Sequence, residues 1–284
     1  MANLHAPLVA FFDIDGTLIH SNPESYAKAQ APGASVEEQE RVFLPTPAVR
    51  EAIQEFVDKG NLAFLCSGRP PSGLSLLMER VPFSGYVALA GALGEMEGKE
   101  LFCHSVDAAL MARAIEIFDE CSVAVLLEGT RGSVVFKPAG EHPDIDLSVP
   151  MTGDTAEAVA SIDRLALVKA FWMAEENDRL APYQAELDRL FRVSDLGVGG
   201  YELSAPHISK ASGMADVLAA VGAHGTVYGF GDSENDVSML QAADVAVVMD
   251  NGVESVKELA DVIAPPVFAD GVATMLHRVL AGEL

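Results

Sequence analysis

The chain changes from a strand-like apolar run to an acidic loop close to its N-terminus. Residues 8–12 are all apolar and are followed at once by Asp13-Ile14-Asp15-Gly16. Such a run is typical of a strand buried in a parallel sheet, and open α/β sheets bind ligands at the carboxyl ends of their strands. Two carboxylates held this close repel each other by about 1 to 4 kcal/mol in surface-like surroundings. A hard divalent cation would offset that repulsion; an ordinary Asp-Gly turn after a strand is the alternative at this point.

Two further apolar segments end in polar residues in the same way. They are residues 62–66, followed by Ser67-Gly68-Arg69, and residues 226–230, followed by Gly231-Asp232-Ser233-Glu234-Asn235-Asp236. The carboxyl ends of parallel strands meet at one edge of a sheet, so we expect these polar residues to lie near Asp13. A single lysine, Lys210, precedes a helical stretch and offers a positive charge to the same site.

The composition fits one good hydrophobic core, or a core with a smaller second domain. The chain has 284 residues, of which 50% are hydrophobic, and it has no apolar stretch long enough to span a membrane. Its 42 acidic and 18 basic residues give a formal net charge of −24, which disfavours a nucleic-acid-binding surface. Three cysteines without metal-ligand spacing fit reduced thiols, and the N-terminus lacks a signal-peptide pattern. We expect a cytoplasmic protein without nucleic-acid or membrane partners, and the oligomeric state is unknown at this point.

The hydrophobic pattern predicts a helix over residues 47–57, with Thr46 as its N-cap and Pro47 in its first position. A longer polar connection, residues 20–44, precedes it and contains a short helix predicted from Ser35. The pattern changes from about residue 91 to residue 192. There it predicts a separate set of strands and helices, including strands at residues 100–105 and 167–173 and a hairpin around residues 128–132.

Four motifs in this order resemble the haloacid dehalogenase (HAD) superfamily, and within it the Cof-type phosphatases with an α/β (C2-type) cap. They are Asp13-Ile14-Asp15-Gly16-Thr17-Leu18, Ser67-Gly68-Arg69, Lys210 and Gly231-Asp232-Ser233-Glu234-Asn235-Asp236. The resemblance implies a Rossmann-like parallel-sheet core of residues 1–90 and 193–284, with an α/β cap domain of residues 91–192 inserted. The chain departs from the family pattern at Ala90, where these phosphatases usually have Asn, and this puts the role of that amide in doubt.

The resemblance assigns catalytic roles to the acidic residues. Asp13 is the expected nucleophile, which forms an aspartyl-phosphate, and Asp15 is the expected general acid and base. The expected metal ligands are Asp13, Asp232 and the backbone carbonyl of Asp15, with Asp236 acting through water or by orienting a neighbour. These are all oxygen donors, without His or Cys, and such a set matches Mg²⁺ better than zinc.

The remaining motif residues are expected to bind the phosphate. The Ser67 hydroxyl and the Gly68 N–H are suited to its oxygens, and Asn235 offers an amide. Arg69 is a further phosphate ligand, unless it pairs with an acidic side chain instead. Lys210 is expected to place a positive charge beside both the phosphate and Asp13.

The expected function is a Mg²⁺-dependent phosphomonoesterase that hydrolyses a small phosphorylated metabolite, such as a sugar or polyol phosphate. Two alternatives remain at this point: a phosphomutase of the phosphomannomutase type, and a non-catalytic phosphate-binding module. The second of these would predict the loss of Asp13, Asp15 or Lys210, and all three are present.

Overall fold

The protein consists of two compact units in a computed structural model that describes residues 6–20, 29, 31, 33–143, 145, 149–196 and 199–284. The first unit, the core, contains residues 1–101 and 210–284, and the second contains residues 102–209. The second unit therefore begins and ends later in the sequence than the predicted cap of residues 91–192. The reason is that the chain adds two more strands to the core sheet after residue 91, and adds two strands to the second sheet after residue 191.

The core is built on an eight-stranded sheet with the order β14-β13-β12-β1-β2-β3-β4-β5. Its strands are β1 (Val9–Phe12), β2 (Leu62–Cys66), β3 (Gly85–Ala88), β4 (Leu93–Met96), β5 (Lys99–Cys103), β12 (Val227–Gly231), β13 (Val245–Met249) and β14 (Val262–Ala264). The six strands from β14 to β3 are parallel, and β4 pairs antiparallel with β3. The α/β architecture with a mostly parallel core sheet was correctly predicted.

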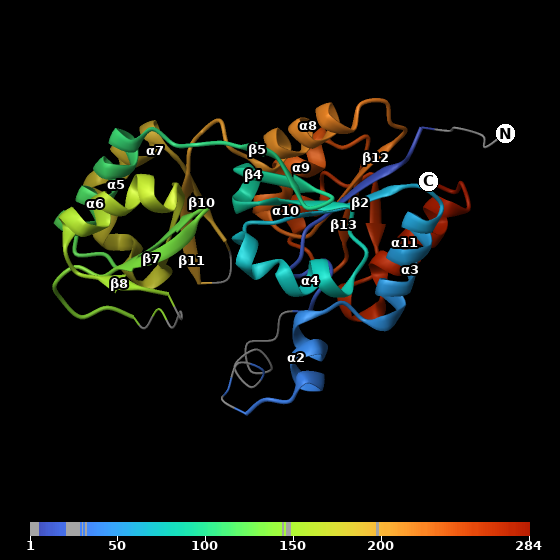
Figure 1. Cartoon of the computed structure of the whole chain (residues 1–284), viewed down its shortest axis with the longest axis horizontal. Helices are drawn as coiled ribbons and strands as arrows, with labels where there is room; N and C mark the ends of the chain where they lie inside the picture. The colour runs from blue at the N-terminus through green and yellow to red at the C-terminus, as the bar shows by residue number, and fades with distance from the viewer. Residues whose placement is uncertain are drawn as a thin grey trace. The chain divides into compact units, whose positions relative to one another are not determined.

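Helices cover both faces of the core sheet, which explains why its central strands are apolar throughout. The core helices are α2 (Val36–Phe43), α3 (Pro47–Asp58), α4 (Ser75–Arg80), α8 (Lys210–Val221), α9 (Val237–Ala242), α10 (Glu254–Lys257) and α11 (Gly271–Leu280). Short 3₁₀ segments are η1 (Pro71–Gly73), η2 (Leu89–Gly91), η4 (Glu234–Asp236) and η5 (Val267–Ala269). In Figure 1, α3 and α11 lie side by side, and both pack on the face formed by Ala10 and Phe12.

Helix α3 forms where the sequence predicted a helix. The Thr46 side chain accepts a hydrogen bond from the N–H of Val49, and Pro47 occupies the first turn. The buried residues Val49, Ile53 and Phe56 face the core with the period of a helix. The predicted helix after Ser35 is also present as α2, with a capping box between Ser35 and Glu38, but it contains no buried residue. Residues 21–28, 30 and 32 of the 20–44 connection lie outside the described residues.

The second unit has its own sheet and core. Its six strands follow the order β10-β11-β9-β6-β7-β8. They are β6 (Val125–Gly129), β7 (Gly132–Phe136), β8 (Met151–Thr152), β9 (Leu167–Met173), β10 (Arg192–Asp195) and β11 (Gly200–Ser204). The helices of this unit are α5 (Ala108–Glu120), α6 (Thr155–Leu165) and α7 (Gln184–Leu190), together with the 3₁₀ helix η3 (Ala174–Tyr183). Trp172 of β9 is buried against Phe118 of α5, and its indole N–H donates to Asn177. The tryptophan is therefore a core residue of this unit.

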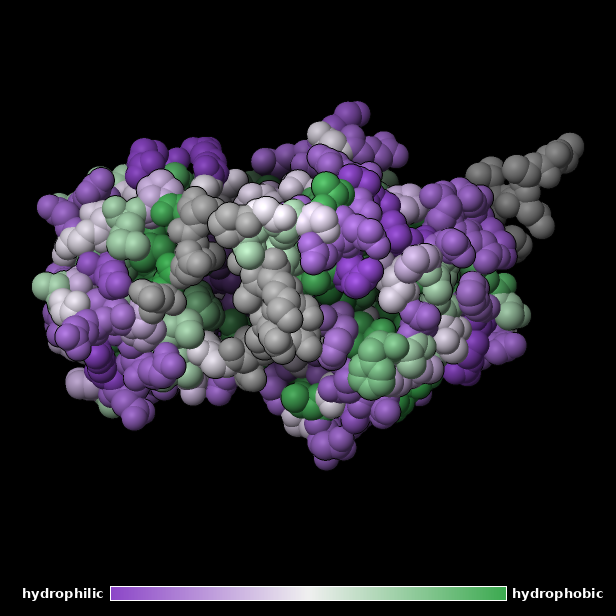
Figure 2. Space-filling model, turned by 90° about the horizontal axis from the view of Figure 1, so that it is seen from below, coloured by the Kyte–Doolittle hydropathy of each residue, from purple (hydrophilic) through white to green (hydrophobic). Residues whose placement is uncertain are grey.

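Within the described part of the chain, no helix is long and apolar enough to cross a membrane. Hydrophilic residues cover much of the described surface on the face shown in Figure 2, where apolar residues are scattered among them.

Candidate active site

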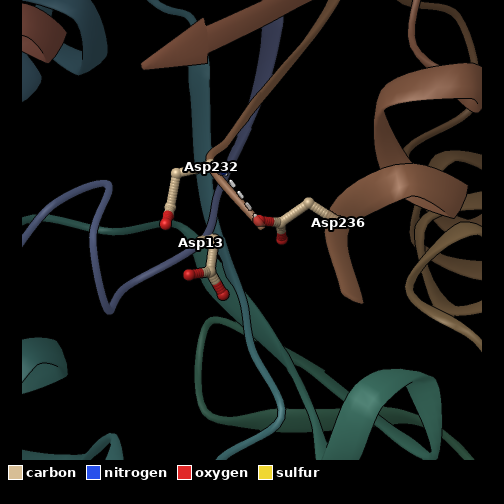
Figure 3. A group of neighbouring side chains, drawn as sticks. All are labelled: Asp13, Asp232 and Asp236. Carbon is tan, nitrogen blue, oxygen red and sulfur yellow. Dashed lines mark hydrogen bonds between the residues drawn. The ribbon is translucent and has the colours of Figure 1, made fainter. Parts of the chain in front are cut away.

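Three aspartates converge at the carboxyl end of the core sheet (Figure 3). Asp13 follows β1, Asp232 follows β12, and Asp236 ends the short η4 segment. Phe12 of β1 pairs with Phe230 of β12 in the parallel sheet, so these neighbouring strands end close together. The Asp13 and Asp232 carboxylates that follow them therefore lie near each other. One carboxylate oxygen from each aspartate lies within 4.8 Å of the other two. Asp13 and Asp236 are buried, and Asp232 is half-buried.

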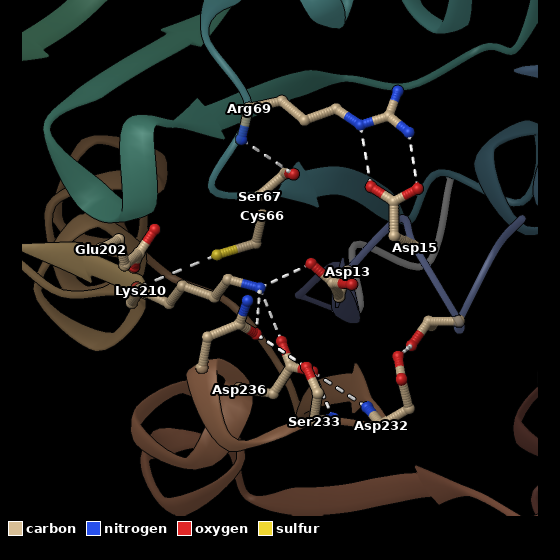
Figure 4. Close-up of polar contacts among 12 residues, drawn as sticks. Asp13, Asp15, Cys66, Ser67, Arg69, Glu202, Lys210, Asp232, Ser233 and Asp236 are labelled. Carbon is tan, nitrogen blue, oxygen red and sulfur yellow. Dashed lines mark hydrogen bonds and ion pairs between the residues drawn. The ribbon is translucent and has the colours of Figure 1, made fainter. Parts of the chain in front are cut away.

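Lys210 joins two of these carboxylates from the start of α8 (Figure 4). Its Nζ donates to Asp13 Oδ1 at 2.5 Å and to Asp236 Oδ1 at 2.6 Å. Asn235 Oδ1 accepts a longer hydrogen bond from the same nitrogen, at 3.4 Å. The Lys210 side chain is only 1% exposed, so its charge depends on these partners for stabilisation.

Asp236 also shapes the loop that carries Asp232. Its second oxygen accepts hydrogen bonds from the backbone N–H groups of Asp232 at 2.9 Å and Ser233 at 3.0 Å. Both oxygens of Asp236 are thus bonded to groups of the chain itself. This arrangement fits the predicted role of orienting a neighbour.

The acidic cluster is electrically unbalanced. Burial raises the pKa of Asp13 well above its ordinary value of 3.8; Lys210 opposes this, and the charges of Asp236 and Asp232 add to it. Burial, followed by the charge of Asp236, raises the pKa of Asp232 to about 7. Burial acts to lower the pKa of Lys210, but the charges of Asp13 and Asp236 outweigh it, so the net shift is upward and the lysine stays protonated. Three carboxylates beside one ammonium leave a surplus of negative charge, and a divalent cation would neutralise it.

The loop after Asp13 is fixed by contacts that the sequence did not reveal. The Thr17 hydroxyl donates to Asp232 Oδ1 at 2.7 Å, and the Asn251 side chain donates to the carbonyl of Gly16 at 2.8 Å. Asn251 Oδ1 in turn accepts from the N–H of Val267 at 2.7 Å. Gly16 has φ +94°, and a Cβ there would lie 2.2 Å from Asp232 Oδ2. The segment after the apolar run of residues 245–249 also follows the family pattern and contains Asn251. Its contact with Gly16 depends on the fold, because the two residues are 235 positions apart in the sequence.

The segment after β2 brings Ser67 to the same edge of the sheet. Ser67 is buried, its N–H donates to Val87 O at 2.9 Å, and its hydroxyl oxygen accepts from the Arg69 N–H at 3.2 Å. The next turn is the 3₁₀ segment η1, and α4 begins only at Ser75. Ala90, where the sequence departs from the family pattern, lies in η2 and has φ +54°. Asn tolerates this left-handed conformation better than Ala does, which gives a backbone reason for Asn at this place in the family pattern.

Arg69 and Asp15 form a pair of their own. Asp15 Oδ2 accepts from Arg69 Nε at 2.9 Å, and Asp15 Oδ1 accepts from Nη2 at 2.6 Å. The Asp15 side chain is 45% exposed and that of Arg69 is 22% exposed. Of the two outcomes considered for Arg69 from the sequence, the structure shows the contact with an acidic side chain.

The chain is similar to known proteins in both sequence and fold. Residues 10–276 match the haloacid dehalogenase-like hydrolases, and the chain therefore belongs to that family. A solved HAD subclass IIB sugar phosphatase has the same fold, with a TM-score of 0.73 and 20% sequence identity over 95% of this chain and 98% of that chain. The predicted membership of the HAD superfamily is confirmed, and the fold is shared with a subclass IIB member.

Two curated relatives align with more than nine-tenths of the chain. The Bacillus subtilis protein named "Putative phosphatase YkrA" is 26% identical over 279 residues, which cover 93% of this chain and 94% of the relative. The 5-amino-6-(5-phospho-D-ribitylamino)uracil phosphatase YwtE of the same organism is 22% identical over 300 residues, which cover 95% of this chain and 97% of the relative. The protein is a HAD-type phosphatase, as its sequence predicted.

Proposed function

We propose that this phosphatase is a Mg²⁺-dependent phosphomonoesterase that hydrolyses a sugar or polyol phosphate through an aspartyl-phosphate on Asp13. The observation that carries the proposal is the buried cluster in which Lys210 bonds to Asp13 and Asp236 while Asp232 lies within reach. Phosphoryl transfer to an aspartate requires a nucleophilic carboxylate, a positive charge and a cation, and Asp13, Lys210 and the three-aspartate cluster would supply them.

The donor set supports magnesium as the cation. The three side chains offer oxygen atoms only, and Mg²⁺ prefers oxygen ligands and retains several waters. Asp13 and Asp232 would hold the ion together with the backbone carbonyl of Asp15, while Asp236 fixes the Asp232 loop and Lys210. When bound, Mg²⁺ would neutralise charge on the phosphate oxygens.

In the first step, a carboxylate oxygen of Asp13 attacks phosphorus, and the bond from phosphorus to the ester oxygen breaks. The departing alkoxide takes a proton from the Asp15 carboxyl, which leaves Asp15 as a carboxylate. In the second step, Asp15 accepts a proton from a water molecule as that water attacks phosphorus. The bond to Asp13 then breaks, and inorganic phosphate and both aspartates are regenerated.

The other polar residues of the site bind and orient the phosphate in this proposal. The Ser67 hydroxyl, the Gly68 N–H and the Asn235 amide act as donors to its oxygens. Lys210 holds Asp13 in place and contributes positive charge. Ser67 is already at the carboxyl end of β2, and Asn235 is already bonded to Lys210 and to the Ser233 hydroxyl.

The proposed substrate class rests on two comparisons. One relative is named for a substrate with a phosphorylated ribityl chain, which is a polyol phosphate, and one structural neighbour is described as a sugar phosphatase. The test is release of inorganic phosphate from a panel of sugar, polyol, nucleotide and cofactor phosphates, with Mg²⁺ and with excess chelator. We expect the sugar and polyol phosphates to have the highest kcat/KM, and chelator to abolish turnover. Equal turnover in chelator, or activity confined to nucleotides, would contradict the proposal.

The same assay in ¹⁸O-labelled water separates hydrolysis from a mutase reaction. Hydrolysis must place one solvent oxygen in the released phosphate. A mutase would transfer the phosphoryl group within the sugar without release, and a binding module would do neither.

A further inference from the structure

Arg69 contacts Asp15 through a two-point fork, whereas Lys210 contacts Asp13 through a single atom. Two nitrogens of the guanidinium donate to two different oxygens of one carboxylate, at 2.9 and 2.6 Å (Figure 4). A planar fork of this kind fixes the orientation of a carboxylate as well as its position, which one ammonium nitrogen cannot do.

The local chain holds Arg69 in the position that this contact needs. Its backbone N–H donates to the Ser67 hydroxyl at 3.2 Å, and its carbonyl accepts from the N–H of Leu89 at 3.0 Å. The third guanidinium nitrogen, Nη1, lies 3.4 Å from the carbonyl of Gly73. Arg69 is thus tied to the end of β2, to η2 and to η1, all of which belong to the core.

Asp15 is more exposed than the three clustered aspartates. Its side chain is 45% exposed, on a loop that turns through Gly16, and it lies outside the cluster that Lys210 organises. An exposed aspartate samples several rotamers, and a misplacement of about 1 Å in a reacting group is sufficient to cost roughly 100-fold in rate.

We infer that Arg69 is a positioning residue for Asp15, and that it acts on the proton transfer and not as a ligand of the substrate phosphate. The inference rests on the proposed function, because it assumes that Asp15 protonates the leaving group. Arg69 would then matter most for substrates whose leaving group needs that proton. Alkyl phosphates, with poor alkoxide leaving groups, belong to this class, whereas aryl phosphates have a leaving group that departs more easily.

The test compares Arg69→Gln, Arg69→Lys, Asp15→Asn and the double variant Asp15→Asn/Arg69→Gln. Single-turnover phosphorylation of the enzyme is measured with an alkyl and an aryl phosphate, and inorganic phosphate serves as a competitive inhibitor. Arg80→Gln is the matched control, since Arg80 at the end of α4 forms a partly exposed ion pair with Glu40 of α2. Thermal melts check that each variant is folded, and Arg69→Lys supplies a milder change if Arg69→Gln folds poorly.

We expect Arg69→Gln to slow the alkyl phosphate by about 10- to 100-fold and the aryl phosphate by several-fold less, the pattern of a misplaced general acid. Arg69→Lys should recover part of this loss. The inhibition constant of inorganic phosphate should change by less than about twofold. In the Asp15→Asn background, Arg69→Gln should add little, because the two residues act as one unit.

The inference is overturned if Arg69→Gln slows both substrates equally and weakens phosphate inhibition in proportion, or if its effect is undiminished in the Asp15→Asn background. Either result would make Arg69 a phosphate ligand. A wild-type enzyme that releases no phosphate from any substrate would instead overturn the proposed function itself.

Discussion

Lys210 has the most demanding environment of the residues in the site. An ammonium group that is 1% exposed would be costly to bury alone, and here two carboxylates within 2.6 Å offset that cost. The same contacts hold Asp13 and Asp236 in place, so the lysine has a structural role as well as an electrostatic one. The sequence indicated Lys210 through its place among four ordered motifs, but its bond to Asp236 required the fold.

Lys210→Met should therefore destabilise the protein as well as inactivate it. Removing one partner of a buried ion pair leaves uncompensated charge, which typically costs about 3 to 5 kcal/mol in the free energy of unfolding. The measurement is urea denaturation without metal, with Lys59→Met as the control. Lys59 forms an exposed pair with Glu55, for which we expect a change below about 1 kcal/mol. Equal losses in the two variants would refute the role given to Lys210.

Gly16→Ala tests the close packing of the Asp13 loop on Asp232. Gly16 has φ +94° and has no room for a Cβ, which would lie 2.2 Å from Asp232 Oδ2. Gly60 has φ +85° but no atom within 4 Å of its Cβ position, so Gly60→Ala measures backbone strain alone. Each variant should lose about 1 to 2 kcal/mol of stability through that strain. Only Gly16→Ala should also raise the Mg²⁺ concentration for half-maximal activity, and an unchanged Mg²⁺ requirement would count against the proposed ligand role of Asp232.

At the level of elements, the sequence was most informative where local signals and burial agree. The Thr46–Pro47 start and the apolar period of α3 predicted that helix to within a residue, and β9 over Leu167–Met173 was predicted at the same residues. The strands β10 and β11 were not predicted. Their residues carry little apolar alternation, and their pairing with each other and with β9 is a long-range property. The strand predicted at residues 100–105 belongs to the edge of the core sheet as β5, because sheet membership is also set by long-range pairing.

The two helix caps offer a test of how far α2 and α3 contribute to stability. Thr46 caps α3 and also donates to Asp270 Oδ1 at 2.6 Å, so Thr46→Ala should lower the free energy of unfolding by about 0.5 to 2 kcal/mol. Ser35→Ala removes an equivalent cap from α2, which has no buried residue, and its effect on global unfolding should be smaller. Chemical denaturation of both variants decides this. A larger loss for Ser35→Ala would mean that α2 is integral to the core.

At the scale of the whole molecule, the site's surplus negative charge makes stability depend on pH and metal together. Without a cation, folding raises the pKa of Asp232 from 3.8 to about 7 and raises that of Asp13 as well. The folded protein therefore binds more protons than the unfolded one between these pH values, and its free energy of unfolding falls as pH rises from about 4 to about 7. Above that range Asp232 is ionised in both states, and its contribution levels off.

Added Mg²⁺ should reverse this loss, because the cation favours the ionised carboxylates. We expect the increase in melting temperature on adding Mg²⁺ to be small at pH 5 and larger at pH 8. Asp232→Asn should reduce both the pH dependence and the response to Mg²⁺. An increase in melting temperature that is the same at pH 5 and pH 8 would contradict this account.

Both steps of the proposed reaction pass through a phosphoryl group on Asp13, which rapid-quench mass spectrometry can detect. The wild-type enzyme is mixed with a reactive substrate and Mg²⁺, quenched in acid within one turnover, and digested for peptide mapping. We expect one added phosphoryl group on Asp13, which decays as inorganic phosphate appears. We also expect a folded Asp13→Ala variant to show neither the adduct nor turnover. A phosphoryl group on another residue, or wild-type turnover in Asp13→Ala, would contradict the proposed reaction.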